Sequence, residues 1–328
     1  MAKALQSTDL NFPVKFEKYA GKVRDNYNIM DQVMILVATD RISAFDHILP
    51  RGIPYKGQVL NQTAAYFLEA TRDIAPNHLL SAPDPNVTIG VRCQPVPVEM
   101  VVRGYLCGHA WRTYRDGGRE LCGVTLPDGL RQNDPFPEPI VTPTTKSMIG
   151  HDEDISEAEI LKSGLVDHDV WGEMRYYAVE LFKRGQQMAN EKGLVLADTK
   201  YEFGVFQNER VMLIDEIHTP DSSRYFYLDG FEERQDRGEK QEQLSKEFVR
   251  EWLMANGFQG REGEQMPVMP DDFVEQVSNR YIEVFETVTG QKFEKADTEN
   301  IDRRIETSVM AALKEMGMES PESTSKPN

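Results

Sequence analysis

Acidic and basic side chains gather in residues 196–224, and their types and spacing suit phosphate and metal chemistry. The stretch begins Leu-Ala-Asp-Thr-Lys-Tyr-Glu-Phe-Gly and continues to an Asp-Glu pair and a Pro-Asp-Ser-Ser-Arg run. Apolar runs bounded by glycine and polar residues predict two strands, over residues 194–206 and 211–217. Asp198, Lys200 and Glu202 then lie on one face, because side chains alternate along a strand.

The turn between these strands decides which residue lies opposite Glu202. If Asn208 and Glu209 form a two-residue turn, Glu202 pairs with Asp215, and directly opposed Cβ atoms are about 4.5–5.5 Å apart. Two such carboxylates repel each other unless a cation lies between them, and Mg²⁺ binds through one or two carboxylates plus substrate phosphates. We predict a metal–phosphate site; a solvated face with scattered charge is the alternative. A one-residue change of register would separate the pair.

A glycine and two basic residues form a second candidate site near the N-terminus. Strands are predicted over residues 14–19, 23–29 and 33–38, and the first turn reads Gly21-Lys22-Val23-Arg24. Glycine lets backbone N–H groups approach a phosphate, and the basic residues can neutralise it. An ordinary hairpin is the alternative. Residues 39–46 then hold Asp, Arg, Ser and Asp in a loop, which fits either chemistry or backbone capping.

Apolar spacing and capping residues predict the helices that support these segments. They cover residues 58–72, 168–191, 245–255, 271–289 and 299–316. Pro95 and Pro97 separate two apolar segments, 91–96 and 98–102, and predict a hinge between domains at residues 1–96 and 97–316, followed by a disordered tail over 317–328. Arg103 closes the second segment, where it favours an anion contact. Residues 126–143 and 230–243 are predicted to be loops.

Composition excludes several classes of protein. The net charge of −17 over 328 residues argues against non-specific binding to nucleic acid or to an anionic membrane. No apolar run approaches the ~18 residues of a membrane span. Three cysteines without metal-binding spacing indicate reduced thiols, and the N-terminus lacks the apolar core of a signal peptide. We therefore expect a cytoplasmic protein with no nucleic-acid or membrane partner.

Together these motifs resemble the phosphoribosylaminoimidazole-succinocarboxamide synthase (SAICAR synthetase) family, over residues 19–290. Residues 196–204 match the family's Asp-x-Lys-x-Glu-Phe-Gly motif, and residues 21–25, 43–46, 98–103, 215–216 and 220–224 also look like family motifs. The region around Gly57 and the C-terminal helices are similar to the longer, single-function members. One position departs: His109 stands where the family has Ser or Thr.

The resemblance implies an α+β fold, with an N-terminal antiparallel sheet domain like the small lobe of protein kinases and an ATP-grasp-like second domain. It implies a ligase of purine biosynthesis that joins carboxyaminoimidazole ribotide (CAIR) to L-aspartate, through phosphorylation of the carboxylate. ATP becomes ADP and phosphate, and the products include SAICAR. A monomer or homodimer is expected. The alternatives are a small-molecule kinase of related fold and a non-catalytic nucleotide-binding module.

The resemblance also assigns roles to residues already singled out. Mg²⁺ would be held by Glu202 and Asp215, while Lys200 would stabilise the carboxylate or the transferred phosphoryl group. The ATP site would comprise Gly21, Lys22, Val23, Arg24 and Glu99. The ribotide would be held by Arg103, His109, Asp221, Ser223 and Arg224. Residues near the imidazole substrate or aspartate would be Ser43, Asp46, Lys146 and Asp152.

Overall fold

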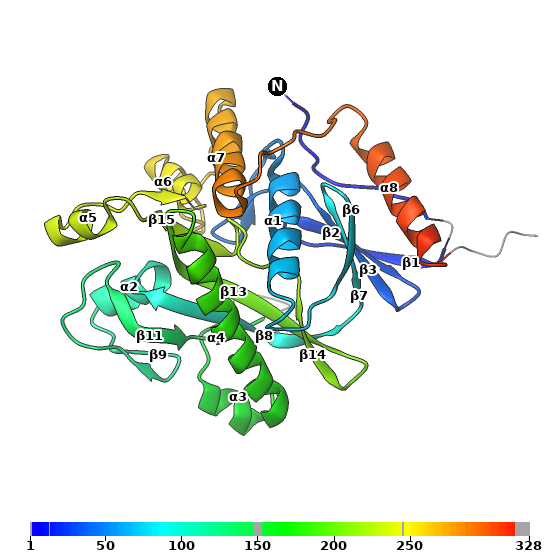
Figure 1. The fold of residues 1–328 in the computed structure, drawn as a ribbon. Coiled ribbons are helices and arrows are strands. Elements are labelled where there is room, and N and C mark those ends of the chain that lie inside the picture. Colours follow the sequence, from blue (N-terminus) through cyan, green and yellow to red (C-terminus); the bar gives the residue numbers. More distant parts are fainter. Residues whose placement is uncertain (1, 13, 147–152, 245, 319–328) are drawn as a thin grey trace, which may run out of the picture.

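The structure is a computed structural model that describes residues 2–12, 14–146, 153–244 and 246–318. Two large antiparallel sheets, besides two small two-stranded ones among the described residues, are joined by helices that pack around and between them (Figure 1). This arrangement confirms the predicted α+β fold. Asp152 and almost all of the predicted C-terminal tail lie outside the described residues.

The first sheet has five strands in the order β1-β2-β3-β7-β6. Their bounds are β1 Phe16–Ala20, β2 Arg24–Ile29, β3 Val33–Ala38, β6 Leu79–Asp84 and β7 Val87–Val91. Helix α8 (Ile301–Glu315) packs against this sheet together with the N-terminal segment, because Ile305 and Val309 share an apolar core with Leu10 and Phe12. The three predicted N-terminal strands are confirmed; β6 and β7 were not foreseen.

The second sheet has seven strands. Its main order is β11 (Pro135–Val141), β8 (Gln94–Tyr105), β13 (Leu194–Phe206), β15 (Ser223–Tyr227) and β16 (Gln243–Leu244). Two further strands, β12 (Thr144–Thr145) and β14 (Arg210–Ile214), pair with β8 and β13 respectively. Strands β8 and β13 are thus central, and each has neighbours on both sides.

Helix α4 (His168–Asn190) covers one face of this second sheet (Figure 1). Its buried residues Met174 and Phe182 share a core with Met100 of β8 and Tyr201 of β13. Because side chains alternate along a strand, the residues next to Met100 and Tyr201 face away from α4. The opposite face therefore carries the charged residues of both strands.

Helices α1 (Lys56–Ala70), α6 (Glu247–Ala255) and α7 (Asp271–Thr289) form another apolar core. Val59 and Leu60 of α1 pack there with Val277 and Phe285 of α7, and Leu253 of α6 joins them. The remaining short elements are β4 (Ser43–Ala44), β5 (His47–Ile48), α2 (Gly108–Arg115), β9 (Glu120–Leu121), β10 (Val124–Thr125), α3 (Glu157–Ser163) and α5 (Phe231–Arg237). All five predicted helices are confirmed within a few residues of their expected ends.

The two segments predicted on either side of Pro95 and Pro97 form one strand, because both prolines lie inside β8; a hinge between domains at this point stays a prediction. Lys146 N–H donates to the Pro97 carbonyl, on the side of β8 away from β13. Since the nitrogen and carbonyl of one strand residue point the same way, Pro97 removes no donor from the ladder with β13. Two predicted loops are also partly wrong: residues 126–143 contain β11, and residues 230–243 contain α5.

The register of the central hairpin differs by one residue from the prediction. Phe206 pairs with Arg210, so the loop has three residues and Glu202 lies opposite Ile214 rather than Asp215. The tight turn is centred on Gln207 and Asn208, whose φ values of 50° and 62° both lie in the left-handed region. Glu209 is then an extra loop residue, and this insertion moves the partner of Glu202 by one position.

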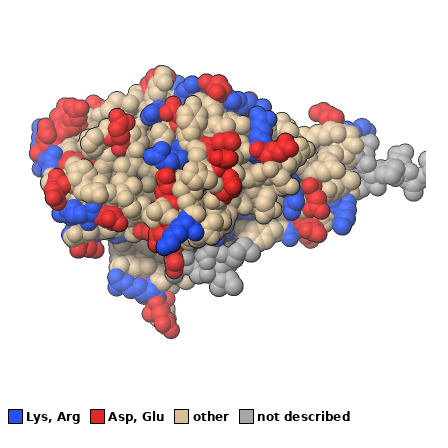
Figure 2. Space-filling model, turned by 90° about the horizontal axis from the view of Figure 1, so that it is seen from below, with Lys and Arg blue, Asp and Glu red and all other residues tan. Residues whose placement is uncertain are grey.

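Charges of both signs are spread over the surface. On the face in Figure 2, acidic and basic side chains are interspersed among the residues that the structure describes, and neither sign covers a continuous area. Among those same residues, no helix combines the length and the apolar character needed to cross a bilayer.

Candidate functional site

A pocket of about 190 Å³ opens on the face of the second sheet that points away from α4. Residues from β8, β13, β15, α2 and α6 and from the loop before β15 line it. They are Val101, Arg103, His109, Arg112, Asp198, Thr199, Lys200, Pro220, Asp221, Ser222, Ser223, Arg224, Lys246, Glu247 and Arg250. Six of these are Lys or Arg and three are Asp or Glu, so the lining carries an excess of positive charge. A pocket of this kind suits an anionic ligand.

Sheet register places two arginines beside one aspartate in the pocket wall. Asp198 of β13 pairs with Arg103 of β8 on one side and with Arg224 of β15 on the other. Its Oδ2 lies 3.2 Å from Arg103 Nη1 and 2.5 Å from Arg224 Nη1. Burial opposes the charge of Arg224, but Asp198, Cys107 and Glu247 together outweigh burial and raise the pKa of Arg224 above its ordinary value. One carboxylate therefore holds two guanidinium groups.

Glycine is required where α2 begins, beside this arginine pair. Gly108 has φ +57°, and a Cβ there would lie 2.6 Å from Arg224 Nη1. Its neighbour His109 lines the pocket, and His109 Nε2 lies 2.7 Å from Asp154 Oδ2. His109 is thus placed with the predicted ribotide residues despite its departure from the family pattern.

Three basic residues of the pocket, Arg112, Lys246 and Arg250, were missed by the sequence reasoning. Arg112 follows His109 by three residues on α2, and Lys246 and Arg250 are four residues apart at the start of α6. Residues three or four apart share one face of a helix. That spacing was a usable signal, but the sequence did not indicate that these faces turn toward the pocket.

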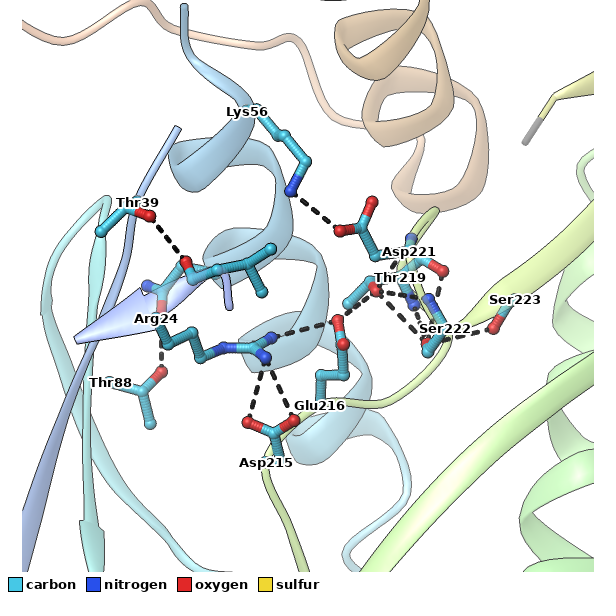
Figure 3. Close-up of polar contacts among 12 residues, drawn as sticks. Arg24, Thr39, Lys56, Thr88, Asp215, Glu216, Thr219, Asp221, Ser222 and Ser223 are labelled. Atoms are coloured by element: carbon cyan, nitrogen blue, oxygen red, sulfur yellow. Dashed lines mark hydrogen bonds and ion pairs between the residues drawn. The ribbon is translucent and has the colours of Figure 1, made fainter. Parts of the chain in front are cut away.

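Asp221 lies at the centre of a buried charged cluster at the edge of the pocket. Its Oδ2 is 2.8 Å from Lys56 Nζ and 3.5 Å from Lys246 Nζ; the ion pair with Lys56 is drawn in Figure 3. Tyr281 Oη donates to Oδ1 over 2.5 Å. Burial alone would raise the pKa of Asp221, but the two ammonium groups reverse this effect and hold it well below its usual range. Asp221 is therefore ionised and held from both sides.

Acidic residues gather beyond the pocket, along the same face of β8 and β13. Glu99 lies directly opposite Glu202, and Glu99 Oε2 accepts a hydrogen bond from Lys200 Nζ at 2.7 Å. Lys146 forms an ion pair with Glu202. Burial and the nearby Asp215 raise the pKa of Glu202 to about 7, although Lys146 offsets part of the effect. Negative charge is thus concentrated here beyond what the lysines neutralise.

Asp215 and Glu216 extend this acidic group at the end of β14, where Asp215 turns the chain with φ 65°. Arg24 of β2 lies between them: its Nη1 is 3.0 Å from Asp215 Oδ1 and its Nη2 is 3.1 Å from Glu216 Oε2 (Figure 3). The two sheets are therefore joined by partly buried ion pairs. Arg24 was expected to cover ATP phosphates; its guanidinium is directed to these carboxylates, and a contact with phosphate stays a prediction.

The Gly21–Arg24 turn is close to the residues predicted with it. Gly21 N–H donates to the Arg24 carbonyl at 2.7 Å. Arg41 donates from Nη2 to the Gly21 carbonyl at 2.9 Å and from Nε to the Lys22 carbonyl at 3.2 Å, which fixes the turn. Lys22 Nζ lies 2.8 Å from Asp46 Oδ1, so two predicted site residues meet.

Two other predicted residues have clear positions. Ser223 belongs to β15, and its hydroxyl lies 2.7 Å from that of Thr199 inside the pocket lining. Ser43 lies in the short strand β4, immediately before the turn that carries Asp46. The structure thus brings the predicted ribotide residues into one pocket and places the predicted nucleotide turn with Ser43 and Asp46.

The antiparallel sheets, the basic pocket and the adjoining carboxylates define the class: an α+β protein with a site for anionic small molecules. The sequence profile of the SAICAR synthetase family matches residues 17–267. The chain belongs to the SAICAR synthetase family.

Curated relatives and a solved structure agree with this assignment. The phosphoribosylaminoimidazole-succinocarboxamide synthase of Bacteroides thetaiotaomicron is 62% identical over 95% of this chain and 99% of its own. The protein of the same name from Flavobacterium psychrophilum is 54% identical over 94% and 98%. The structure of SAICAR synthase from Saccharomyces cerevisiae complexed with SAICAR is 34% identical, with a TM-score of 0.75, over 88% of this chain and 99% of that one.

Proposed function

We propose that this chain is an ATP-dependent ligase that joins carboxyaminoimidazole ribotide to L-aspartate and gives SAICAR, ADP and phosphate. The observation that carries the proposal is the pocket in which Asp198 fixes Arg103 and Arg224 beside Lys200. Membership of the SAICAR synthetase family supports the choice of substrates.

The ribotide occupies the basic pocket in this proposal. Guanidinium groups bind phosphate as a bidentate fork, and their donors are preorganised here by Asp198. Arg103 is further oriented by its Nε–H, which donates to Thr142 Oγ1 at 2.9 Å. Because these arginines are fixed before the ligand arrives, little side-chain entropy remains to be lost on binding. Asp221, Ser223 and His109 complete the ribotide site.

The chemistry needs activation of the ribotide carboxylate, because its oxygen is a poor leaving group. In the proposed sequence that oxygen attacks the γ-phosphorus of ATP, and ADP leaves. The amine of L-aspartate then attacks the acyl carbon, loses a proton and expels phosphate, which forms the amide. Phosphoryl transfer depends mainly on positioning and charge neutralisation. Lys200 lines the pocket and its ammonium lies beside Glu99, where it can stabilise the transferred group.

The acidic residues beside the pocket fit Mg²⁺. Carboxylate oxygens are its preferred protein ligands, and burial together with the charge of Asp215 raises the pKa of Glu202. Among the described residues, no group of three or more His, Cys, Asp or Glu forms a metal cluster. Two carboxylates plus nucleotide phosphates is the combination that Mg²⁺ uses in phosphoryl transfer. Asp215 is not the strand partner of Glu202, but its charge acts on Glu202. We therefore assign both residues to this ion, which would neutralise phosphate charge when bound.

The nucleotide phosphates lie against the Gly21–Arg24 turn in this proposal, and Glu99 lies near the nucleoside. Arg41 holds the carbonyls of Gly21 and Lys22. Ser43, Asp46 and Lys146, with Asp152 outside the described residues, are assigned near the imidazole or aspartate. The cytoplasmic location, the division at residue 96 and the monomeric or homodimeric state remain predictions.

The proposal is tested by ADP release from the purified chain. The assay contains carboxyaminoimidazole ribotide and Mg²⁺-ATP, with L-aspartate or with no amino acid. We expect ADP and SAICAR to form in equal amounts, and only when L-aspartate is present. ADP release that does not need an amine acceptor would favour a kinase, and no release under either condition would favour a non-catalytic nucleotide-binding module.

A further inference from the structure

Helix α7 reaches the edge of the basic pocket through one side chain, Tyr281. This residue is buried, with 4% of its surface exposed. Its hydroxyl donates to Asp221 Oδ1 at 2.5 Å, and its ring faces the Lys56 ammonium at 5.4 Å from the ring centre. The family profile ends at residue 267, before α7 begins. Tyr281 is thus a contact between the pocket and a helix outside the matched segment.

The contacts of Asp221 show what this hydroxyl contributes. Lys56 and Lys246 both lie at Oδ2. Among the residues that the structure describes, Tyr281 is the one donor to Oδ1. The two ammonium groups hold one oxygen and the Tyr281 hydroxyl holds the other, so donors on both sides of the carboxylate fix its plane. Tyr281 therefore supplies one of the two anchors that orient Asp221.

Lys246 connects this orientation to the ligand. Its Nζ lies 3.5 Å from Asp221 Oδ2, and both residues line the pocket. Burial lowers the pKa of Lys246, and Asp221 opposes this effect. A correctly placed Asp221 thus keeps a positive charge at the pocket wall, where an anionic ligand is bound.

The helix that carries Tyr281, α7, is firmly packed against its neighbours. Val277 and Phe285, on the same helix, are buried against Val59 and Leu60 of α1. Ser278 Oγ donates to the Pro54 carbonyl at 2.7 Å, which anchors α7 to the residues that precede α1. A side chain held in this way can fix a neighbour within a few tenths of an ångström, as active sites require.

We propose that Tyr281 is a positioning residue for ribotide binding, because its hydroxyl orients the Asp221 carboxylate and thereby the Lys246 ammonium at the pocket wall. The inference rests on the proposed function and assigns α7 a part in it. Tyr281 does not touch the reacting atoms; it acts through Asp221.

The test is Tyr281→Phe, which keeps the ring in the core and removes only the hydroxyl. The hydrogen bond to a charged partner is lost, so we expect the KM for the ribotide to rise roughly tenfold. The KM values for ATP and L-aspartate are expected to stay within about twofold of wild type, because nothing else in the pocket changes. The dissociation constant of the ribotide, measured by calorimetry without ATP, should rise by the same factor as its KM.

The chain offers a matched control in Tyr227→Phe. Tyr227 Oη donates to Glu283 Oε1 at 2.5 Å, so this variant also loses a tyrosine–carboxylate bond to α7. Neither Tyr227 nor Glu283 lines the pocket. Both variants are compared with wild type by thermal unfolding and by ribotide affinity. Weakened ribotide binding in Tyr281→Phe alone supports the proposal.

Equal ribotide affinities in wild type and both variants would overturn it and leave Tyr281 with a structural role only. A general loss, in which the KM values for ATP and L-aspartate rise as much as that for the ribotide, would also overturn it. If wild type itself neither binds the ribotide nor releases ADP with L-aspartate, the proposed function fails, and this inference fails with it.

Discussion

Glu202→Gln tests whether the buried charge of a proposed metal ligand destabilises the folded chain. The substitution keeps the shape of the side chain and removes its charge. Burial and the neighbouring Asp215 raise the pKa of Glu202 from 4.5 to about 7. Because the pKa of Glu202 is higher in the folded chain than in the unfolded chain, ionisation of Glu202 lowers the free energy of unfolding. The stabilisation associated with the protonated acid is complete below pH 4.5 and is lost as the pH rises through about 7. Glutamine does not titrate and escapes this loss.

The size of the effect follows from that pKa difference. One pKa unit corresponds to about 1.4 kcal/mol, so ionised Glu202 lowers the free energy of unfolding by on the order of 3 kcal/mol at pH 8. The entropy of unfolding is about 2 cal/mol/K per residue, so for this chain 1 kcal/mol shifts the melting temperature by roughly 1.5 °C. We therefore expect Glu202→Gln to melt about 4 °C above wild type at pH 8, and the two to melt close together near pH 4.5.

The assay is thermal unfolding in the presence of a chelator, followed by the same scan with Mg²⁺ and ADP. A bound cation would compensate the charge of ionised Glu202, an effect that glutamine lacks. The difference between the two melting temperatures should therefore narrow or change sign, and turnover should be lost in the variant. Glu209→Gln, in the exposed loop of the same hairpin, is the matched control and should melt like wild type. A Glu202→Gln protein that melts below wild type at pH 8 without metal would refute the reasoning.

Three further substitutions test the roles of Arg24, Arg103 and Gly108. Arg24→Gln leaves two partly buried carboxylates without their partner, so urea denaturation should show a free energy of unfolding lower by about 3–5 kcal/mol. Arg103→Lys keeps the charge but loses the guanidinium fork, so steady-state kinetics should show a KM for the ribotide at least roughly tenfold higher. Gly108→Ala forces a Cβ against Arg224, so the protein should lose about 1–2 kcal/mol of stability by urea denaturation and bind the ribotide more weakly by calorimetry.

Each of these predictions has an outcome that contradicts it. An Arg24→Gln protein as stable as wild type would mean that the link between the sheets contributes nothing. Wild-type KM values in Arg103→Lys would remove the fork geometry from ribotide binding. If Gly108→Ala binds the ribotide as wild type does, the close approach to Arg224 has no functional consequence.

The parts of the fold that depend on local sequence were predictable. The alternation in residues 194–206 gave β13 and the shared face of Asp198, Lys200 and Glu202, because period-2 patterning is a property of one strand. Helix α7 was predicted at its observed ends, residues 271–289, since apolar spacing and the terminal Gly290 act within the helix itself.

Features that depend on distant contacts were not predictable in this way. The hairpin loop is closed by the pair Phe206–Arg210 because Gln207 adopts a left-handed conformation, which a glutamine in the sequence does not indicate. Pro97 looked like a break because the sequence does not reveal that its nitrogen and carbonyl point away from β13. The basic faces of α2 and α6 became part of the pocket only when the tertiary fold turned them toward β13.

The charge of the pocket is opposite to that of the molecule around it, and this contrast has a kinetic consequence. A chain with a net charge of −17 repels an approaching anion from a distance, whereas the six basic residues of the pocket attract it at contact. At 0.1 M salt the screening length is about 10 Å, so added salt removes the distant repulsion first and weakens contacts within the pocket much less. We expect the association rate of the ribotide to rise as salt is added from very low ionic strength, the reverse of the behaviour of an anion that is steered by a basic surface.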